Sequence, residues 1–163
     1  MKRTDEAERL IDASPARVFA AMTDPGSVAR WLPPSGMTGR VERFEARTGG
    51  TYRIVLSYDD PSGAHGKTSA DEDVVEGAFV EVVPGVRLVQ DVEFESEDAA
   101  FAGVMRLTWE VIADGARSRV RFRAENVPEG ISAEDHLAGF RSSLANLARL
   151  VEGSDAEASV GQP

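Results

Sequence analysis

The sequence predicts an α+β domain in which a curved antiparallel sheet of about seven strands wraps around one long C-terminal helix. Two observations predict it: short β-like runs follow one another with tight turns between them, and an apolar stripe recurs at helical spacing near the C-terminus. Strands joined by tight turns form an antiparallel meander. A long amphipathic helix has to bury its stripe, and one face of that sheet is the only surface large enough.

The expected strands alternate apolar and polar residues and are bounded by turn residues. Gly49-Gly50, Pro84-Gly85 and Asp114-Gly115 mark turns, the last as a two-residue hairpin loop. Residues 59–71 are rich in Asp, Pro, Ser and Gly and therefore predict an exposed loop. The strands are expected over residues 5–12, 39–47, 51–58, 73–83, 86–95, 103–112 and 118–126.

Two short helices are expected after the first strand. Ser14-Pro15 places a capping side chain directly before a proline at the first helical position, where the missing N–H costs nothing. Asp24-Pro25 begins the second helix in the same way. Pro33-Pro34 ends it, because proline cannot continue a helix.

The last expected element is a helix of about twenty residues that begins after Ser132, with an acidic residue three positions on. Gly139 lies inside it at a cost of roughly 1 kcal/mol against alanine; it is either a tolerated defect or a place where another group approaches closely. Gly153 is expected to end the helix, so that residues 1–152 form the domain and residues 153–163 a disordered tail. The apolar stripe consists of Leu137, Phe140, Leu144, Leu147 and Val151.

The composition is that of a globular domain with an acidic surface. The 163 residues are 42% hydrophobic and 28% charged, and the formal net charge of -10 disfavours binding to nucleic acid or to an anionic membrane. Because cysteine is absent, disulfides and thiolate metal sites are excluded. No apolar run is long enough to span a bilayer and the charged N-terminus does not resemble a signal peptide, so we expect a cytoplasmic protein.

Alternation within the expected strands separates an apolar inner face from a charged outer face. Met105, Leu107 and Trp109 share the inner face with other apolar residues, while the alternate residues Arg106, Thr108 and Glu110 point outward. Arg119, Arg121 and Arg123 form a row on the outer face, next to acidic residues of neighbouring strands. This row is either a solvated charged face or an anion-binding site.

Two inward residues have two interpretations each. Gln90 is polar on an apolar face, so its amide either bonds a neighbouring backbone group or faces a ligand. Trp31 ends the second short helix, and its ring either fills the core or lines a pocket.

No motif predicts catalysis, a cofactor or a metal ion. Residues 63–68 resemble the end of a phosphate-binding loop, but Pro61 stands where the first glycine belongs and an acidic strand follows instead of a helix. His65 and His136 have no second metal ligand at a suitable spacing on the same element. A nucleophile elbow of the Gly-x-Ser-x-Gly type does not occur, so no catalytic residue is assigned.

Short motifs also occur in a characteristic order over about residues 4 to 152. They are Ser14-Pro15, Val18-Phe19, Asp24-Pro25, Trp31, Arg47-Thr48-Gly49-Gly50, Tyr52, Glu76-Gly77, Pro84, Arg87-Leu88, His136, Gly139, Phe140, Leu144 and Leu147.

Their order and spacing resemble the activator-of-heat-shock-ATPase homologues, a family of the START-like superfamily that shares the birch-pollen-allergen helix-grip fold. The resemblance implies a helix gripped by a curved sheet, with a cavity between them. Superfamily members bind lipids, sterols, polyketides or plant hormones, and some are cyclases or dehydratases. The eukaryotic members that stimulate a chaperone ATPase carry a further N-terminal domain that these 163 residues do not include.

We therefore expect the domain to bind a small hydrophobic molecule, lipid-like or aromatic, between the sheet and the helix. One alternative is an enzyme acting on an apolar or polyketide-like substrate, with His136 or Gln90 as polar groups in the pocket. Another is a stress-related interaction protein that contacts a chaperone. An exposed strand edge would allow a homodimer. The expected ligand cavity is lined by Trp31, Tyr52, Gln90, Met105, Trp109, His136 and Phe140.

Overall fold

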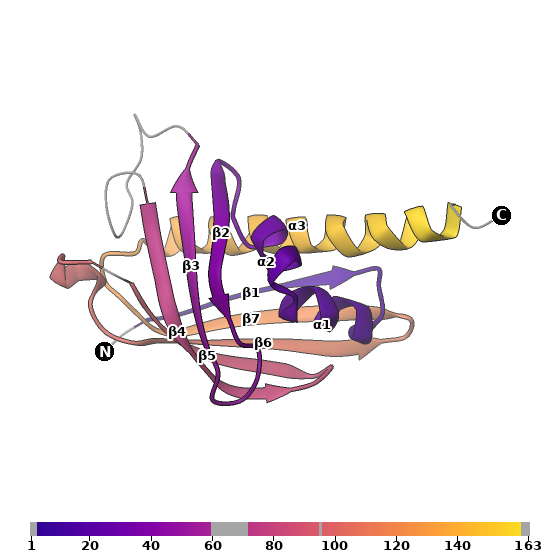
Figure 1. Cartoon of the computed structure of the whole chain (residues 1–163), viewed down its shortest axis with the longest axis horizontal. Coiled ribbons are helices and arrows are strands. Elements are labelled where there is room, and N and C mark those ends of the chain that lie inside the picture. The colour runs from indigo at the N-terminus through magenta and orange to yellow at the C-terminus, as the bar shows by residue number, and fades with distance from the viewer. Residues whose placement is uncertain (1–2, 60–71, 95, 161–163) are drawn as a thin grey trace.

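The computed structural model describes residues 3–59, 72–94 and 96–160, and only the backbone of residues 153–160. Within these residues an antiparallel sheet curves along one side of a long helix (Figure 1). The strands are β1 (Arg3–Ile11), β2 (Met37–Phe44), β3 (Thr51–Tyr58), β4 (Glu72–Val83), β5 (Arg87–Phe94), β6 (Met105–Asp114) and β7 (Arg117–Val127). The helices are α1 (Pro15–Thr23), α2 (Pro25–Trp31), the short 3-10 helix η2 (Ala99–Phe101) and α3 (Ala133–Val160).

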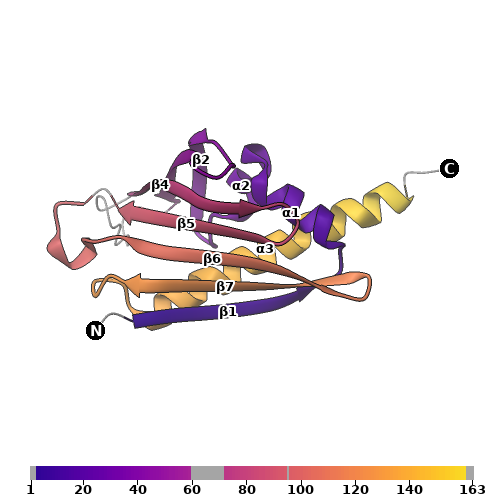
Figure 2. The same cartoon turned by 90° about the horizontal axis from the view of Figure 1, so that it is seen from below.

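The sheet is the predicted meander with the first strand added beside the last. The spatial order is β1-β7-β6-β5-β4-β3-β2, and each neighbouring pair is antiparallel. Figure 2 shows α3 lying across one face of this sheet, while Figure 1 places α2 next to β2, with α1 beside α2. The predicted fold class is therefore confirmed, with α3 covering the inner face.

The three predicted helix starts are capped as expected. The Arg17 amide donates to Ser14 Oγ at 3.3 Å and the Ser27 amide to Asp24 Oδ2 at 2.9 Å. At the start of α3 the Asp135 amide donates to the hydroxyl of its capping serine at 3.0 Å. These side chains satisfy amides that the first helical turn leaves without an intrahelical partner.

The β6–β7 hairpin turns one residue later than predicted. Asp114 pairs with Arg117 in the ladder, so the two loop residues are Gly115 and Ala116 rather than Asp114 and Gly115. Gly115 has a φ of 63°, which a glycine adopts without a steric penalty. A glycine at the first loop position is typical of a type II′ hairpin turn, whose twist matches that of the strands.

The predicted end of the last helix at Gly153 is wrong. Helix α3 continues through this glycine to Val160. A glycine inside a helix costs only about 1 kcal/mol, and the alanines and glutamate that follow it favour helix, with no proline before Pro163. The division into a domain at residues 1–152 and a disordered tail at 153–163 stays a prediction, and the backbone of 153–160 is helical.

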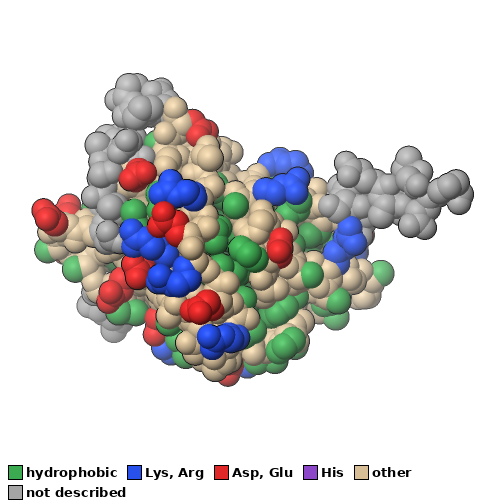
Figure 3. All heavy atoms as spheres, viewed as in Figure 1, with side chains coloured by type: hydrophobic (Ala, Val, Ile, Leu, Met, Phe, Trp, Pro, Cys, Tyr) green, Lys and Arg blue, Asp and Glu red, His purple; other side chains and the backbone are tan. Residues whose placement is uncertain are grey.

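The outer face of the sheet is a paired charged surface. Arg119 and Arg121 both bind Glu8, at 3.2 and 3.3 Å, and Arg123 binds Glu6 at 3.3 Å. Figure 3 shows the same alternation of basic and acidic side chains over the outer face of β2 to β4. Of the two interpretations of the arginine row, the structure therefore favours the solvated charged face.

One predicted segment has no counterpart in the described part of the structure. Residues 60–71, which include the phosphate-loop-like stretch 63–68 and His65, lie outside the described residues.

Candidate functional site

A cavity of about 860 Å³ lies between the inner face of the sheet and the first half of α3. Its walls come from α2, from strands β2 to β7 and from α3, and most of its lining side chains are aliphatic or aromatic. This volume is within the usual range for small-molecule sites. All seven residues predicted to line a cavity do so; that they contact a ligand stays a prediction. They are Trp31, Tyr52, Gln90, Met105, Trp109, His136 and Phe140.

Gln90 and Trp109 form a hydrogen-bonded pair on adjacent strands in this cavity. The indole Nε1 of Trp109 donates to Oε1 of Gln90 at 3.0 Å, and both side chains are buried. The register pairs Leu88 with Trp109, so Gln90 is the diagonal neighbour on the same face. The interpretation in which Gln90 bonds a backbone group is wrong. Its side-chain oxygen accepts from the large indole of Trp109, which extends across from β6.

Trp31 both fills the core and lines the cavity. Its indole Nε1 donates to the backbone oxygen of Ala21 at 2.9 Å, which ties α2 to α1. Its ring meets Trp109 edge to face, with centroids 5.4 Å apart and planes at 82°. Edge-to-face contact is a favoured geometry for aromatic pairs, so the two indoles hold each other in place in the cavity wall.

Tyr52 and Met105 contribute buried, largely apolar surface to the cavity. The Tyr52 hydroxyl donates to the backbone oxygen of Asp91 at 3.3 Å. Burial, and to a lesser extent the charge of Asp91, raises the pKa of the Tyr52 phenol, so the side chain stays neutral. A Cβ at Gly77 would overlap the backbone oxygen of Asp91 and lie 2.9 Å from the Tyr52 hydroxyl, which explains a glycine at this point of β4.

His136 is held by a carboxylate that the sequence analysis did not identify. Its Nδ1 lies 2.7 Å from Oδ2 of Asp5, and its ring contacts that of Phe140 in a tilted arrangement, with centroids 4.0 Å apart and planes at 50°. Asp5 also accepts a hydrogen bond from Nε of Arg3 at 2.8 Å. Asp5 is in phase with the inward residues Ala7 and Ile11 of β1, which was the available signal in the sequence.

The electrostatics of this group fix its protonation. Burial acts to raise the pKa of Asp5, but hydrogen bonds from Arg3 and His136, together with their charges, hold that pKa below its ordinary value. The carboxylate therefore stays ionised and accepts, so Nδ1 of His136 carries the hydrogen of their shared bond. A carboxylate that orients an imidazole in this way sets its tautomer and ring angle.

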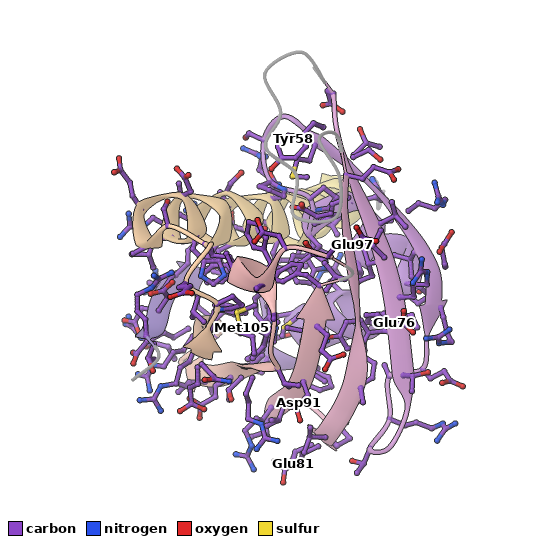
Figure 4. All side chains as sticks on the ribbon, turned by 90° about the vertical axis from the view of Figure 1, so that its left-hand side faces the viewer. Tyr58, Glu76, Glu81, Asp91, Glu97 and Met105 are labelled. Atoms are coloured by element: carbon purple, nitrogen blue, oxygen red, sulfur yellow. The ribbon has the colours of Figure 1, made fainter. Side chains whose placement is uncertain are left out.

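Three further polar residues meet at one end of the cavity. Tyr58, Asp73 and Asp135 all line it. The pKa of Tyr58 is raised, first by burial and then by the negative charges of Asp73 and Asp135. Figure 4 shows Tyr58 at the upper end of the strands and Met105 deeper, below the helix. Sequence analysis missed Tyr58 and Asp73, although each falls on the inward phase of its strand.

Small and polar residues of α3 complete the cavity wall. A Cβ built on Gly139 meets no atom within 4 Å, so this glycine borders open space. The Ser143 hydroxyl donates to the backbone oxygen of Leu32 at 2.6 Å, and the amide nitrogen of Asn146 donates to that of Pro33 at 3.0 Å. These bonds hold α3 to the segment after α2. No described group approaches Gly139 within 4 Å, so both interpretations of this glycine stay predictions.

Neither a metal centre nor a membrane span is found in the described part of the chain. No group of three or more His, Asp or Glu side chains is arranged there to hold a metal ion. Among the same residues, no helix combines the length and apolarity needed to cross a bilayer.

A curved antiparallel sheet that grips a long helix around an apolar cavity defines the class of helix-grip proteins. The model of one family, described as activator of Hsp90 ATPase homolog 1-like protein, matches residues 12–152. The chain therefore belongs to that family.

Solved structures share the fold of this chain. A Chromobacterium violaceum protein is 31% identical, with a TM-score of 0.80 over 91% of this chain and 96% of its own. An AHSA1-like protein from Aeromonas hydrophila is 18% identical, with a TM-score of 0.70 over 94% of each chain. A Rhodobacter sphaeroides protein is also 18% identical, with a TM-score of 0.75 over 92% of each chain. None of the curated proteins compared with the chain matches it.

Proposed function

We propose that this protein binds one small, mostly apolar molecule in the cavity between the sheet and α3. The observation that carries the proposal is the cavity itself, about 860 Å³ with mainly aliphatic and aromatic walls. Such a space suits a ligand of drug-like size. Helix-grip proteins often enclose hydrophobic ligands, and membership of the family supports the same function.

The polar groups deep in the cavity favour an apolar ligand. Trp31, Trp109 and Tyr52 each use their donor on a protein acceptor. A ligand that lies against these rings therefore gains contact area without having to satisfy their N–H or O–H groups. Burying apolar surface contributes about 25 cal/mol per Å², which is the expected source of affinity.

Intrinsic fluorescence provides a direct test. The chain contains two tryptophans, and both line the cavity. Titration with a panel of fatty alcohols, sterols and aromatic compounds should give a saturable change in tryptophan emission, and native mass spectrometry should show one ligand per chain. Arg121→Ala, on the outer face, is the matched control and should bind like the wild type. If no compound changes the emission or adds to the mass, the proposal is wrong.

A second candidate function is catalysis on the bound molecule, and the His136–Asp5 hydrogen bond of 2.7 Å is the observation that favours it. An imidazole fixed by a carboxylate is a common acid–base arrangement. The test compares the wild type with His136→Gln on compounds that the fluorescence titration identifies. Conversion of a bound compound that the variant loses, while it still binds the compound, would support catalysis; release of every compound unchanged by the wild type would contradict it.

A further inference from the structure

We propose that Gln90 selects the ligand of this cavity by donating a hydrogen bond to an acceptor oxygen, of the carbonyl type, on an uncharged and otherwise apolar molecule. The inference rests on the proposed function and names the chemistry of its ligand. Three features carry it: the orientation of the Gln90 amide, the surroundings of its nitrogen, and the charges that line the cavity.

The orientation of the amide follows from its partner. An indole nitrogen can only donate a hydrogen bond. Since Nε1 of Trp109 lies 3.0 Å from the end of the Gln90 side chain, the atom facing it is the acceptor Oε1. The other end of the amide, Nε2 with its two hydrogens, therefore points away from Trp109.

The nitrogen of this amide reaches the open space of the cavity. In the described part of the chain, Gln90 makes only the bond through its oxygen. No buried side-chain nitrogen or oxygen in that part lacks a partner, so Nε2 is not sealed inside the protein. Gln90 is 8% exposed and lines the cavity, so its N–H donors face the space a ligand would fill. A donor left unpaired against an apolar ligand would weaken binding, whereas an acceptor oxygen would satisfy it.

The charges of the described cavity lining disfavour an anionic head group. The lining includes the carboxylates of Asp73 and Asp135, and among the described residues it contains no lysine or arginine. His136, the remaining titratable base, is bonded to the ionised Asp5. A ligand carboxylate or phosphate would meet like charges there, which disfavours its charged form. The acceptor is therefore expected on a neutral molecule such as a ketone or ester.

The test uses three compounds of similar chain length: 2-nonanone, decane and decanoate. In the wild type, 2-nonanone should bind and decanoate should bind more weakly than the ketone. The variant Gln90→Leu is similar in size and removes the N–H donors together with the oxygen that accepts from Trp109, so the affinity for decane is the control for the loss of that internal bond. The variant should lower the affinity for 2-nonanone about fivefold to tenfold and leave the affinity for decane unchanged, both by tryptophan fluorescence titration.

A second measurement needs only the wild type, in case the variant does not fold. The infrared carbonyl stretch of bound 2-nonanone should lie at a lower frequency than in an alkane solvent, because hydrogen bonding weakens the C=O bond. An unshifted band, an equal loss of both affinities in Gln90→Leu, or tighter binding of decanoate than of the ketone would overturn the inference while the proposed function stands. Failure of all three compounds to bind would overturn both.

Discussion

The two halves of α3 face the same sheet and differ in what lies beneath them. The side chains of α3 are described over residues 133–152, and in the second half of this stretch Leu144, Leu147 and Val151 are buried in a filled core. In the first half the stripe continues as Leu137 and Phe140, and a cavity lined by Gly139, Phe140 and Ser142 lies beneath the helix. Both halves are α-helical, so the difference lies in the side chains that surround the space between helix and sheet.

Hydrogen bonds on both sides of the cavity hold the first half of α3 in place. Toward the C-terminus, Ser143 and Asn146 bind backbone oxygens after α2. Toward the N-terminus, His136 binds Asp5 on the edge strand β1. These bonds, together with the contact between the rings of Phe140 and Phe122, hold the helix above the cavity. The comparison therefore predicts different effects of substitutions in the two halves.

The largest effect is expected in the filled half. Leu147→Ala removes a fully buried side chain and should lower the free energy of unfolding by about 2–5 kcal/mol, measured by urea denaturation. The matched control is Leu137→Ala on the same helix, where the leucine is only half-buried and the loss should stay below about 1 kcal/mol. Equal losses at both positions would remove the distinction between the two halves.

The hydrogen bond that holds the first half of α3 to β1 should give the next largest effect. Asp5→Asn should lower stability near neutral pH by about 1–3 kcal/mol. The folded-state pKa of Asp5 is depressed, so its stabilisation is present above the ordinary carboxyl pKa and is lost as pH falls through the folded value. Denaturation of the variant should therefore depend less on pH in the acid range than that of the wild type.

The control for that prediction is Glu6→Gln. Glu6 is the neighbour of Asp5 on the exposed face and pairs only with Arg123 at the surface. Its acid-range profile should follow the wild type. If the two variants have the same pH profile, the assignment of Asp5 as an anchor is wrong.

The smallest effect is expected on the outer face. Arg121 pairs with Glu8 at 3.3 Å in an exposed position. Such pairs contribute little, so Arg121→Ala should change stability by no more than about 0.5 kcal/mol. A loss several times larger, and insensitive to salt, would show that the outer face is more than a solvated surface.

The fold was largely predictable because its signals are local. Alternation, caps and turn residues located each strand and each α-helix of the described residues, although not the short 3-10 helix η2, and the apolar stripe identified the sheet face that α3 covers. The end of α3 was not predictable from Gly153, because the cost of a single glycine in a helix is smaller than the helical preference of the residues after it.

The site was predictable only in part. Its aromatic walls followed from strand phase, so Trp109 and Tyr52 were identified. Asp5 was missed because its partner His136 is 131 residues away, so the inward phase of Asp5 on its strand does not by itself reveal what the carboxylate binds. The partner of Gln90 depends on how far an indole reaches across two strands, which spacing alone does not specify.

The central claim, that the space beside Gly139 is where a ligand binds, is tested most directly by filling it. Gly139→Ala should raise the free energy of unfolding by about 1 kcal/mol and keep ligand binding, because alanine favours helix and its Cβ meets no neighbour. Gly139→Leu should fold equally well but weaken binding of 2-nonanone by at least about tenfold, measured by tryptophan fluorescence titration. A folded leucine variant that binds the ketone as tightly as the wild type would contradict the account.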